Sequence, residues 1–236
     1  GAAGTSLAVI GAAERSGFGA GEGGRAREGA ALGEVRALAR RLGARWPDAA
    51  RSFHLVSSAG GLFEGQVACG PDAAPAPLRP YGAGKLEQER AVAADAALGR
   101  RRIYRPSSVY GYAPGARRNL VSALVAAALL RRPARIVGAM TTQRDYVLAG
   151  DVGRFIARGV REPGPAEVET HLLASGRPAA IFEIVRLVEG IDGAPLHLQI
   201  DPRPENARDN SFLPSALPPG LRRTPIPEGI ARVAAS

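Results

Sequence analysis

Residues 53–61, Phe-His-Leu-Val-Ser-Ser-Ala-Gly-Gly, are the most informative stretch of the chain. The first four favour a short buried strand, and small hydroxyl and glycine residues follow it at once. Such residues at the carboxyl end of a strand are typical of a ligand site at the edge of a parallel sheet. On both sides of this stretch, short apolar runs alternate with segments of helical periodicity. This alternation predicts an α/β fold built on a parallel sheet.

The expected elements can be placed by residue number. We expect strands at 7–10, 53–56, 103–105, 134–137, 167–174 and 196–200, and helices at 28–42, 85–97, 120–130, 151–160, 180–188 and 227–234. Glycine and proline mark most of the connections between them, as is usual for turns and loops.

Tyr81 and Lys85 lie four residues apart, a spacing that places both side chains on one helical face. An ammonium group favours a nearby phenolate, so we expect Lys85 to lower the pKa of Tyr81. A phenol of that kind can take a proton from an alcohol or give one to a carbonyl oxygen. The spacing alone favours an ordinary helix lysine beside a packed tyrosine. However, Lys85 is the only lysine among 31 basic residues, and a guanidinium does not replace an ammonium as a compact, tunable charge.

Composition excludes several classes of protein. The net charge is +9, but the arginines are dispersed among acids and aromatic residues are only 5% of the chain, so we expect no nucleic-acid partner. No apolar run reaches the length of a membrane span, and no cluster of histidine, cysteine and acidic residues suits a metal. The single cysteine, Cys69, excludes an internal disulfide and fits a reducing compartment. We therefore expect a cytoplasmic protein.

Several further motifs follow one another in a fixed order. They are FHLVSSAGG at 53–61, Tyr-x-x-x-Lys at 81–85, RPSSVYG at 105–111, RDY at 144–146 with Asp151-Val152 after it, LASG at 173–176, Arg203-Pro204 and Glu228-Gly-Ile. Each motif is weak alone, but the ordered set resembles the extended short-chain dehydrogenase/reductase family, the nucleotide-sugar epimerases and dehydratases.

The resemblance implies a Rossmann-like parallel sheet with helices on both faces. It places a cofactor and catalytic domain at residues 1–165 and a small C-terminal substrate-binding region, interleaved with it, at residues 166–236. The implied activity is NAD(P)-dependent epimerisation, dehydration or reduction of a nucleotide sugar or related hydroxylated substrate. Hydride would pass to and from the nicotinamide of NAD or NADP.

The resemblance also assigns roles to individual residues. Tyr81 would be the acid/base, Lys85 would lower its pKa and bind the nicotinamide ribose, and Ser58 would hold the substrate oxygen, with Ser57 as the rival. The cofactor would contact Ala12, Ala13, Ser57, Tyr81, Lys85, Pro106, Ser107 and Val109. The substrate would contact Ser58, Ser108, Asn119, Arg144 and Arg203.

Some of these residues have an ordinary structural alternative. Asn119 precedes an expected helix, where an asparagine is a common N-cap. Arg144 and Arg203 would be bidentate phosphate partners, but surface arginines are abundant in this chain. Ser108 stands where the family usually has an asparagine.

The N-terminal part of the family's fold is not evident in the sequence. That fold begins with a β-α-β-α-β segment carrying G-x-x-G-x-x-G, and only about fifty residues precede the serine strand here. We therefore expect the N-terminal βαβαβ part to be missing or incomplete. Three explanations stay open: a fragment, a chain joined from ordered segments, or a natural relative that no longer binds cofactor. The last supports an alternative function, an inactive relative that acts as a binding or scaffold protein.

The resemblance finally implies a homodimer. In such a dimer the helices at 28–42 and 85–97 of two subunits would pack together as a four-helix bundle. Their apolar content permits this arrangement without requiring it.

Overall fold

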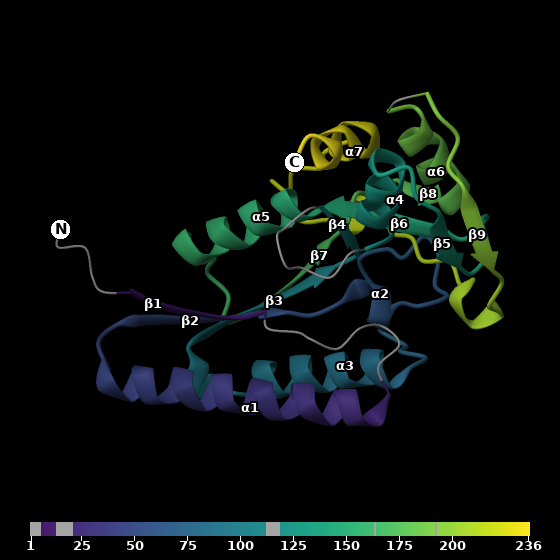
Figure 1. Ribbon diagram of the computed structural model, residues 1–236. Coiled ribbons are helices and arrows are strands. Elements are labelled where there is room, and N and C mark those ends of the chain that lie inside the picture. The colour runs from purple at the N-terminus through teal and green to yellow at the C-terminus, as the bar shows by residue number, and fades with distance from the viewer. Residues whose placement is uncertain (1–5, 13–20, 112–118, 163, 192) are drawn as a thin grey trace. The chain divides into compact units, whose positions relative to one another are not determined.

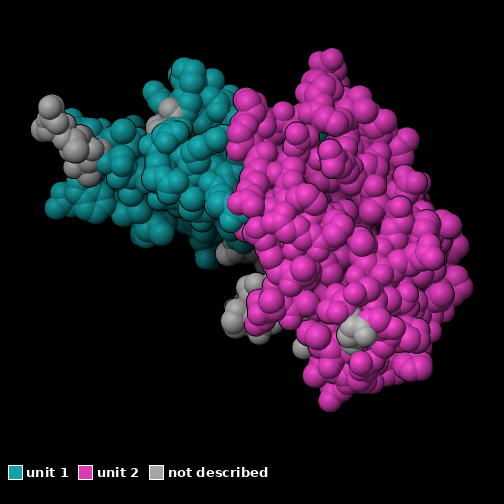
Figure 2. Space-filling model, turned by 90° about the horizontal axis from the view of Figure 1, so that it is seen from above, with its two compact units in different colours: residues 1–63, 74–106, 154–172 teal, residues 64–73, 107–153, 173–236 magenta. Residues whose placement is uncertain are grey.

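The computed structural model describes residues 6–12, 21–111, 119–162, 164–191 and 193–236 (Figure 1). The chain divides into two compact units, which are described separately. Unit 1 comprises residues 1–63, 74–106 and 154–172, and unit 2 comprises residues 64–73, 107–153 and 173–236 (Figure 2). In this grouping residues 107–153 belong with the C-terminal region.

Unit 1 is built on a four-stranded sheet with the order β1-β2-β3-β7. Its strands are β1 (Ser6–Gly11), β2 (Ala50–Val56), β3 (Arg100–Pro106) and β7 (Val168–Leu173). The first three pair in parallel, with Phe53 of β2 opposite Val9 and Arg101. The predicted parallel α/β fold is therefore confirmed.

Helices cover both faces of this sheet, as the sequence predicted (Figure 1). On one face lie α1 (Glu22–Arg45) and α3 (Pro80–Ala93), and on the other lies α5 (Ala149–Arg161). Successive residues of β2 point to opposite faces, so Phe53 and Leu55 join the apolar core under α1 and α3. His54, between them, is buried on the other face beside Tyr104. Residues 53–55 are thus buried on both faces of the sheet, as is usual for a parallel sheet covered by helices.

The two central helices of unit 1 differ in extent from the prediction. Helix α1 begins at Glu22 rather than at residue 28, although glycine is the poorest helix former after proline and occupies positions 21, 23 and 24. Helix α3 begins at Pro80 rather than at Lys85, since proline is well suited to the first turn of a helix. Tyr81 and Lys85 therefore lie on the same helix, as their spacing required.

Among the described residues, unit 2 combines two small sheets with helices that pack against them. The strands are β4 (Ser108–Tyr110), β6 (Gln143–Leu148) and β8 (Pro178–Ala180) in one sheet, and β5 (Ala134–Val137) and β9 (Leu198–Asp201) in the other. The helices are α4 (Leu120–Leu129), α6 (Ile181–Glu189) and α7 (Ile226–Ala234). Their apolar faces form one buried core with Tyr110, Ile136 and Tyr146. Throughout the described residues, no helix has the length and apolarity needed to cross a bilayer.

The buried His54 makes stability depend on pH. Its Nδ1 lies 2.9 Å from the Tyr104 hydroxyl and its Nε2 lies 3.0 Å from Ser52 Oγ. Burial, helped by the charge of Arg102, lowers the pKa of His54 to about 4. The unfolded chain binds this proton with a pKa of about 6.5, so the folded state loses stability as the pH falls from about 6.5 to about 4.

We expect the free energy of unfolding to fall by about 2 kcal/mol between pH 7 and pH 4.5 through this histidine. Urea unfolding at the two pH values measures the change. His54→Gln should reduce the difference. An unaltered pH dependence in His54→Gln would contradict the assignment.

Candidate active site

Two adjacent serines follow strand β2, and the structure gives them different surroundings. Ser58 is the N-cap of the short helix α2 (Ala59–Leu62), and its Oγ accepts a hydrogen bond of 3.2 Å from the Gly61 amide. Ser57 is buried, and its amide donates to the Tyr104 carbonyl at 2.7 Å. The Ser57 Oγ is also buried, without a hydrogen-bond partner among the described residues.

Tyr81 lies in the first turn of α3 and is hydrogen-bonded to Ser58, the serine that the alignment along the strand favoured. The contact depends on the close approach of α2 and α3. A Cβ atom on Gly82 would lie 2.1 Å from the Gly61 carbonyl oxygen, so only glycine allows the two backbones to touch there. Two segments distant in the sequence thus bring the serine hydroxyl and the phenol together.

Lys85 is the buried cation of the site, with 1% of its surface exposed. Its Nζ lies 5.6 Å from the centre of the Tyr81 ring and donates to Gln88 Oε1 at 3.2 Å. The same Nζ forms an ion pair of 3.4 Å with Glu28 Oε2 of α1. Burial lowers the pKa of Lys85 to about 8, while the charge of Glu89 acts in the opposite direction. The ammonium is therefore held between two helices.

The expected lowering of the Tyr81 pKa is wrong for this structure. Burial raises the pKa of Tyr81, the Ser58 hydrogen bond lowers it, and the charge of Glu28 raises it further. The main physical reason is burial, which disfavours the charged phenolate, and in addition Lys85 does not stand alone beside the phenol. Its positive charge is offset by the Glu28 carboxylate, which repels a phenolate.

A second, partly buried ion pair fixes the helix that carries these groups. Arg105 of β3 donates from Nε to Glu89 Oε1 at 3.0 Å and from Nη2 to Glu89 Oε2 at 2.6 Å. Glu89 is 4% exposed, and a bidentate pair of this kind is among the stronger interactions of charged side chains. It ties α3 to the central strand β3, so Tyr81 and Lys85 are presented from a rigid element.

The remaining cofactor residues of the prediction are not all in one unit. Ala12 is exposed and follows β1, Pro106 is buried at the end of β3, and Ala13 lies outside the described residues. Ser107 and Val109 belong to unit 2. The Ser107 hydroxyl donates to Asp145 Oδ1 at 3.4 Å.

The predicted substrate residues Ser108, Asn119, Arg144 and Arg203 belong to unit 2. Asn119 is the N-cap of α4, and its Oδ1 accepts from the Ser122 amide at 3.0 Å. Arg203 is half exposed and pairs with Asp201 at 3.2 Å. Arg144 Nη2 donates to the Asn206 carbonyl at 3.5 Å, in the turn that follows Arg203. Ser108 lies on β4, opposite Tyr146 of β6.

Sequence reasoning missed two residues of the site, Glu28 and Gln88. Gln88 lies three residues after Lys85 on the same helix, and that spacing could have identified it. Glu28 lies on a different helix, and nothing in its local sequence connects it with Lys85. Within the described ranges, no group of three or more histidine, cysteine and acidic side chains could hold a metal ion.

A direct match between this chain and a family model identifies its family. A family model described as the NAD dependent epimerase/dehydratase family matches residues 37–171, more than half of the chain. The chain belongs to this family. The match includes the Ser58, Tyr81 and Lys85 segments, and it confirms the family that the ordered motifs resembled. No curated protein matches the chain.

Several solved structures share the fold. MoeE5 in complex with UDP-glucuronic acid and NAD is 25% identical, with a TM-score of 0.70 over 84% of this chain and 68% of that chain. UDP-glucose 4-epimerase of Thermus thermophilus in complex with NAD is 19% identical, with a TM-score of 0.78 over 97% and 76%. RMD from Pseudomonas aeruginosa complexed with NADPH is 21% identical, with a TM-score of 0.75 over 97% and 80%. The last two share the fold alone.

Proposed function

We propose that the protein catalyses the NAD(P)-dependent epimerisation, dehydration or reduction of a nucleotide sugar or a related hydroxylated substrate. The observation that carries the proposal is the grouping in unit 1 of a serine hydroxyl, a phenol and a buried ammonium. Ser58 is hydrogen-bonded to Tyr81, and Lys85 lies beside the ring of Tyr81. Membership of the epimerase/dehydratase family supports the same reaction class.

The residues present fit a nicotinamide cofactor. The Ser57 Oγ is a buried polar atom with no hydrogen-bond partner among the described residues, and a bound ligand would satisfy it. The Lys85 ammonium supplies donors suited to the hydroxyl oxygens of a ribose. Ser57 and Lys85 would therefore hold the cofactor. When bound, NAD or NADP supplies the hydride acceptor and donor.

The chain's own residues handle the proton. The Tyr81 phenol takes the proton of a substrate hydroxyl or returns one to the ketone oxygen. Ser58 holds the same oxygen by a hydrogen bond, in place of its bond to Tyr81. Lys85 stabilises the phenolate form by its charge, to an extent that its partners control. Arg105 and Glu89 keep α3 in position during the exchange.

A nucleotide sugar is the substrate class that the family and MoeE5 support, since that relative is described with UDP-glucuronic acid. Arg144 and Arg203 remain the predicted partners of its diphosphate, and Asn119 and Ser108 remain predicted contacts. In this proposal Arg203 exchanges its ion pair with Asp201 for a phosphate oxygen, a bidentate contact that guanidinium makes well. The homodimer that packs through α1 and α3 remains part of this proposal, and so does the cytoplasmic location. Light scattering, which measures the mass in solution, tests the dimer.

The proposal is tested with the complete gene product. Binding of NAD and NADP is measured by calorimetry, and a panel of UDP-, dTDP- and GDP-sugars is then followed by NMR for a changed sugar. We expect binding of one cofactor and conversion of at least one sugar. Conversion of no sugar, with the cofactor bound, would contradict the proposal and favour an inactive relative.

A further inference from the structure

The Lys85 ammonium lies among several charged and polar groups from three elements. Helix α1 contributes Glu28, and α3 contributes Gln88 and Glu89 beside Lys85 itself. Strand β3 contributes Arg105, which forms the bidentate pair with Glu89. The charge of Glu89 raises the pKa of Lys85, and an oxygen of Glu28 lies within ion-pair distance of Lys85 Nζ.

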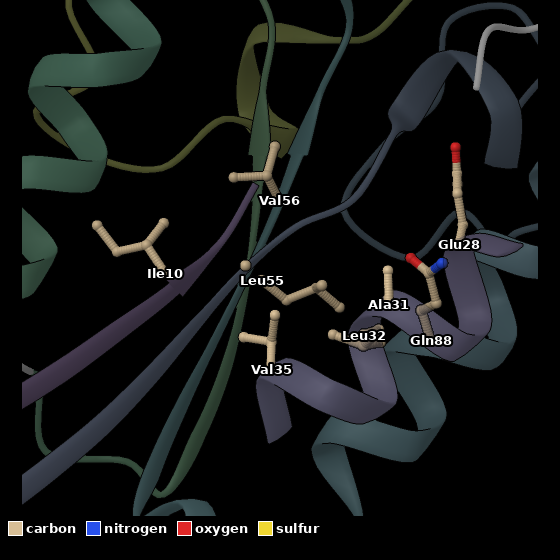
Figure 3. Close-up of a pocket in the computed structure, with 9 residues that line it drawn as sticks. Ile10, Glu28, Ala31, Leu32, Val35, Leu55, Val56 and Gln88 are labelled. Carbon is tan, nitrogen blue, oxygen red and sulfur yellow. The ribbon is translucent and has the colours of Figure 1, made fainter. Parts of the chain in front are cut away.

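Glu28 is itself largely withdrawn from water. Its side chain is 10% exposed, and its Oε2 lies 3.4 Å from Lys85 Nζ. Figure 3 shows Glu28 and Gln88 extending toward the same side from two neighbouring helices. Ion pairs between poorly exposed groups are screened by solvent much less than surface pairs, so solvent screens the Glu28–Lys85 pair only weakly.

A small pocket lies next to this pair and is lined by Glu28, Gln88 and apolar side chains of α1, β1 and β2 (Figure 3). Its volume is about 60 Å³, far below the roughly 300 Å³ or more of a typical ligand site. It has room for only a few water molecules, at roughly 10–15 Å³ for each. The residues that line the pocket include no cationic side chain, and its volume is too small for a large ligand.

We propose that Glu28 is a positioning residue, whose carboxylate holds the Lys85 ammonium beside Tyr81 and thereby decides how readily this pair exchanges protons. The inference rests on the proposed function, because it names the residue that regulates the same acid/base site. With Glu28 ionised, the phenol is kept in its protonated form, the form that gives a proton to a ketone. Without that charge, the ammonium acts on Tyr81 unopposed and favours the proton-accepting form.

The expected direction of the pKa changes at Tyr81 and Lys85 agrees with the charges around them. The charge of Glu28 raises the pKa of Tyr81, and it lies close enough to Lys85 to stabilise the ammonium as well. Neutralising the carboxylate should therefore lower the pKa of both groups. A residue with only a structural role would change stability without moving either titration.

The test measures the titration of Lys85 in the complete protein carrying ¹³Cε-labelled lysine. Lys85 is the only lysine of this chain, and loss of its resonance in Lys85→Arg assigns it. We expect Glu28→Gln to lower the Lys85 pKa by about 1, which means that the amine binds its proton about tenfold more weakly. Glu34→Gln is the matched control, since Glu34 is exposed on the same helix. In that control the Lys85 titration should match the wild type.

Activity provides the second readout. In Glu28→Gln the pH at which kcat/KM reaches half of its plateau should fall together with the pKa of Lys85. In Glu28→Asp, which keeps the carboxylate, both values should return most of the way to those of the wild type. Should Glu28→Gln not fold, Glu28→Asp gives the same test with a smaller fall in pKa, because its shorter side chain lengthens the separation from Nζ.

The outcomes separate the two proposals. If the Lys85 titration is the same in wild type and in every Glu28 variant, the role of Glu28 is wrong, even if the protein is an active enzyme. If the titration moves but no sugar nucleotide is converted, Glu28 does control the proton affinity of the pair and the proposed function is wrong.

Discussion

Tyr81→Phe is expected to lower kcat about 1000-fold, the scale of losing a general acid/base. The phenylalanine ring keeps the packing against α2 but has no proton to give or take. Removing the hydroxyl also removes the hydrogen bond to Ser58, so the stability should change by only about 1 kcal/mol. Steady-state kinetics and thermal unfolding of the same preparations measure the two effects.

Tyr146→Phe is the matched control for this substitution. The Tyr146 hydroxyl is buried in unit 2 and has no hydrogen-bond partner among the described residues, so its removal breaks no bond there. This variant should keep an activity close to that of the wild type. If Tyr81→Phe also keeps an activity close to that of the wild type, Tyr81 is not the acid/base and the proposed mechanism is wrong.

Gly82→Ala is expected to destabilise the protein by about 3 kcal/mol, the upper part of the range for an overpacked site. The new methyl group would lie 2.1 Å from the Gly61 carbonyl oxygen and 2.8 Å from Pro77 Cβ. Backbone cannot yield as a flexible side chain does, so α2 and α3 must separate. Because these two helices carry Ser58 and Tyr81, the activity of the folded fraction should fall as well.

Gly84→Ala tests whether the effect is specific to that contact. Its methyl group would lie 3.0 Å from Cγ of Arg25, a side chain that can shift, and alanine favours a helix over glycine by about 1 kcal/mol. Urea unfolding should therefore show Gly84→Ala to be as stable as the wild type or more so. Equal destabilisation by the two substitutions would show that the Gly61–Gly82 contact is not what requires glycine.

Local pattern determined the type of most elements but not where they end. The apolar run at residues 53–56 predicted a strand, and β2 does contain it. The start of α1 was missed because glycines weaken the helical pattern there, while packing against α3 stabilises the helix in the folded protein. The start of α3 was missed because residues 81–84 are rich in glycine, although Pro80 offered a signal.

The candidate site was predictable only in part, for a similar reason. The four-residue spacing of Tyr81 and Lys85 is local, so the sequence alone indicates that they share a helical face. The choice between Ser57 and Ser58 depends on which of the two hydroxyls contacts Tyr81, and Tyr81 lies on a helix that comes later in the chain. The structure places Ser58, not Ser57, against Tyr81.

What the sequence by itself determined is the parallel α/β fold, the family and the Tyr81–Lys85 pair, since these follow from periodicity, motif order and spacing along the chain. What only the tertiary structure decided is the electrostatic balance at that pair. Glu28 reaches Lys85 from another helix, and burial acts on Tyr81 and Lys85 together. A pKa depends on solvent exclusion and on charges within a few ångströms, and neither quantity exists until distant segments have packed.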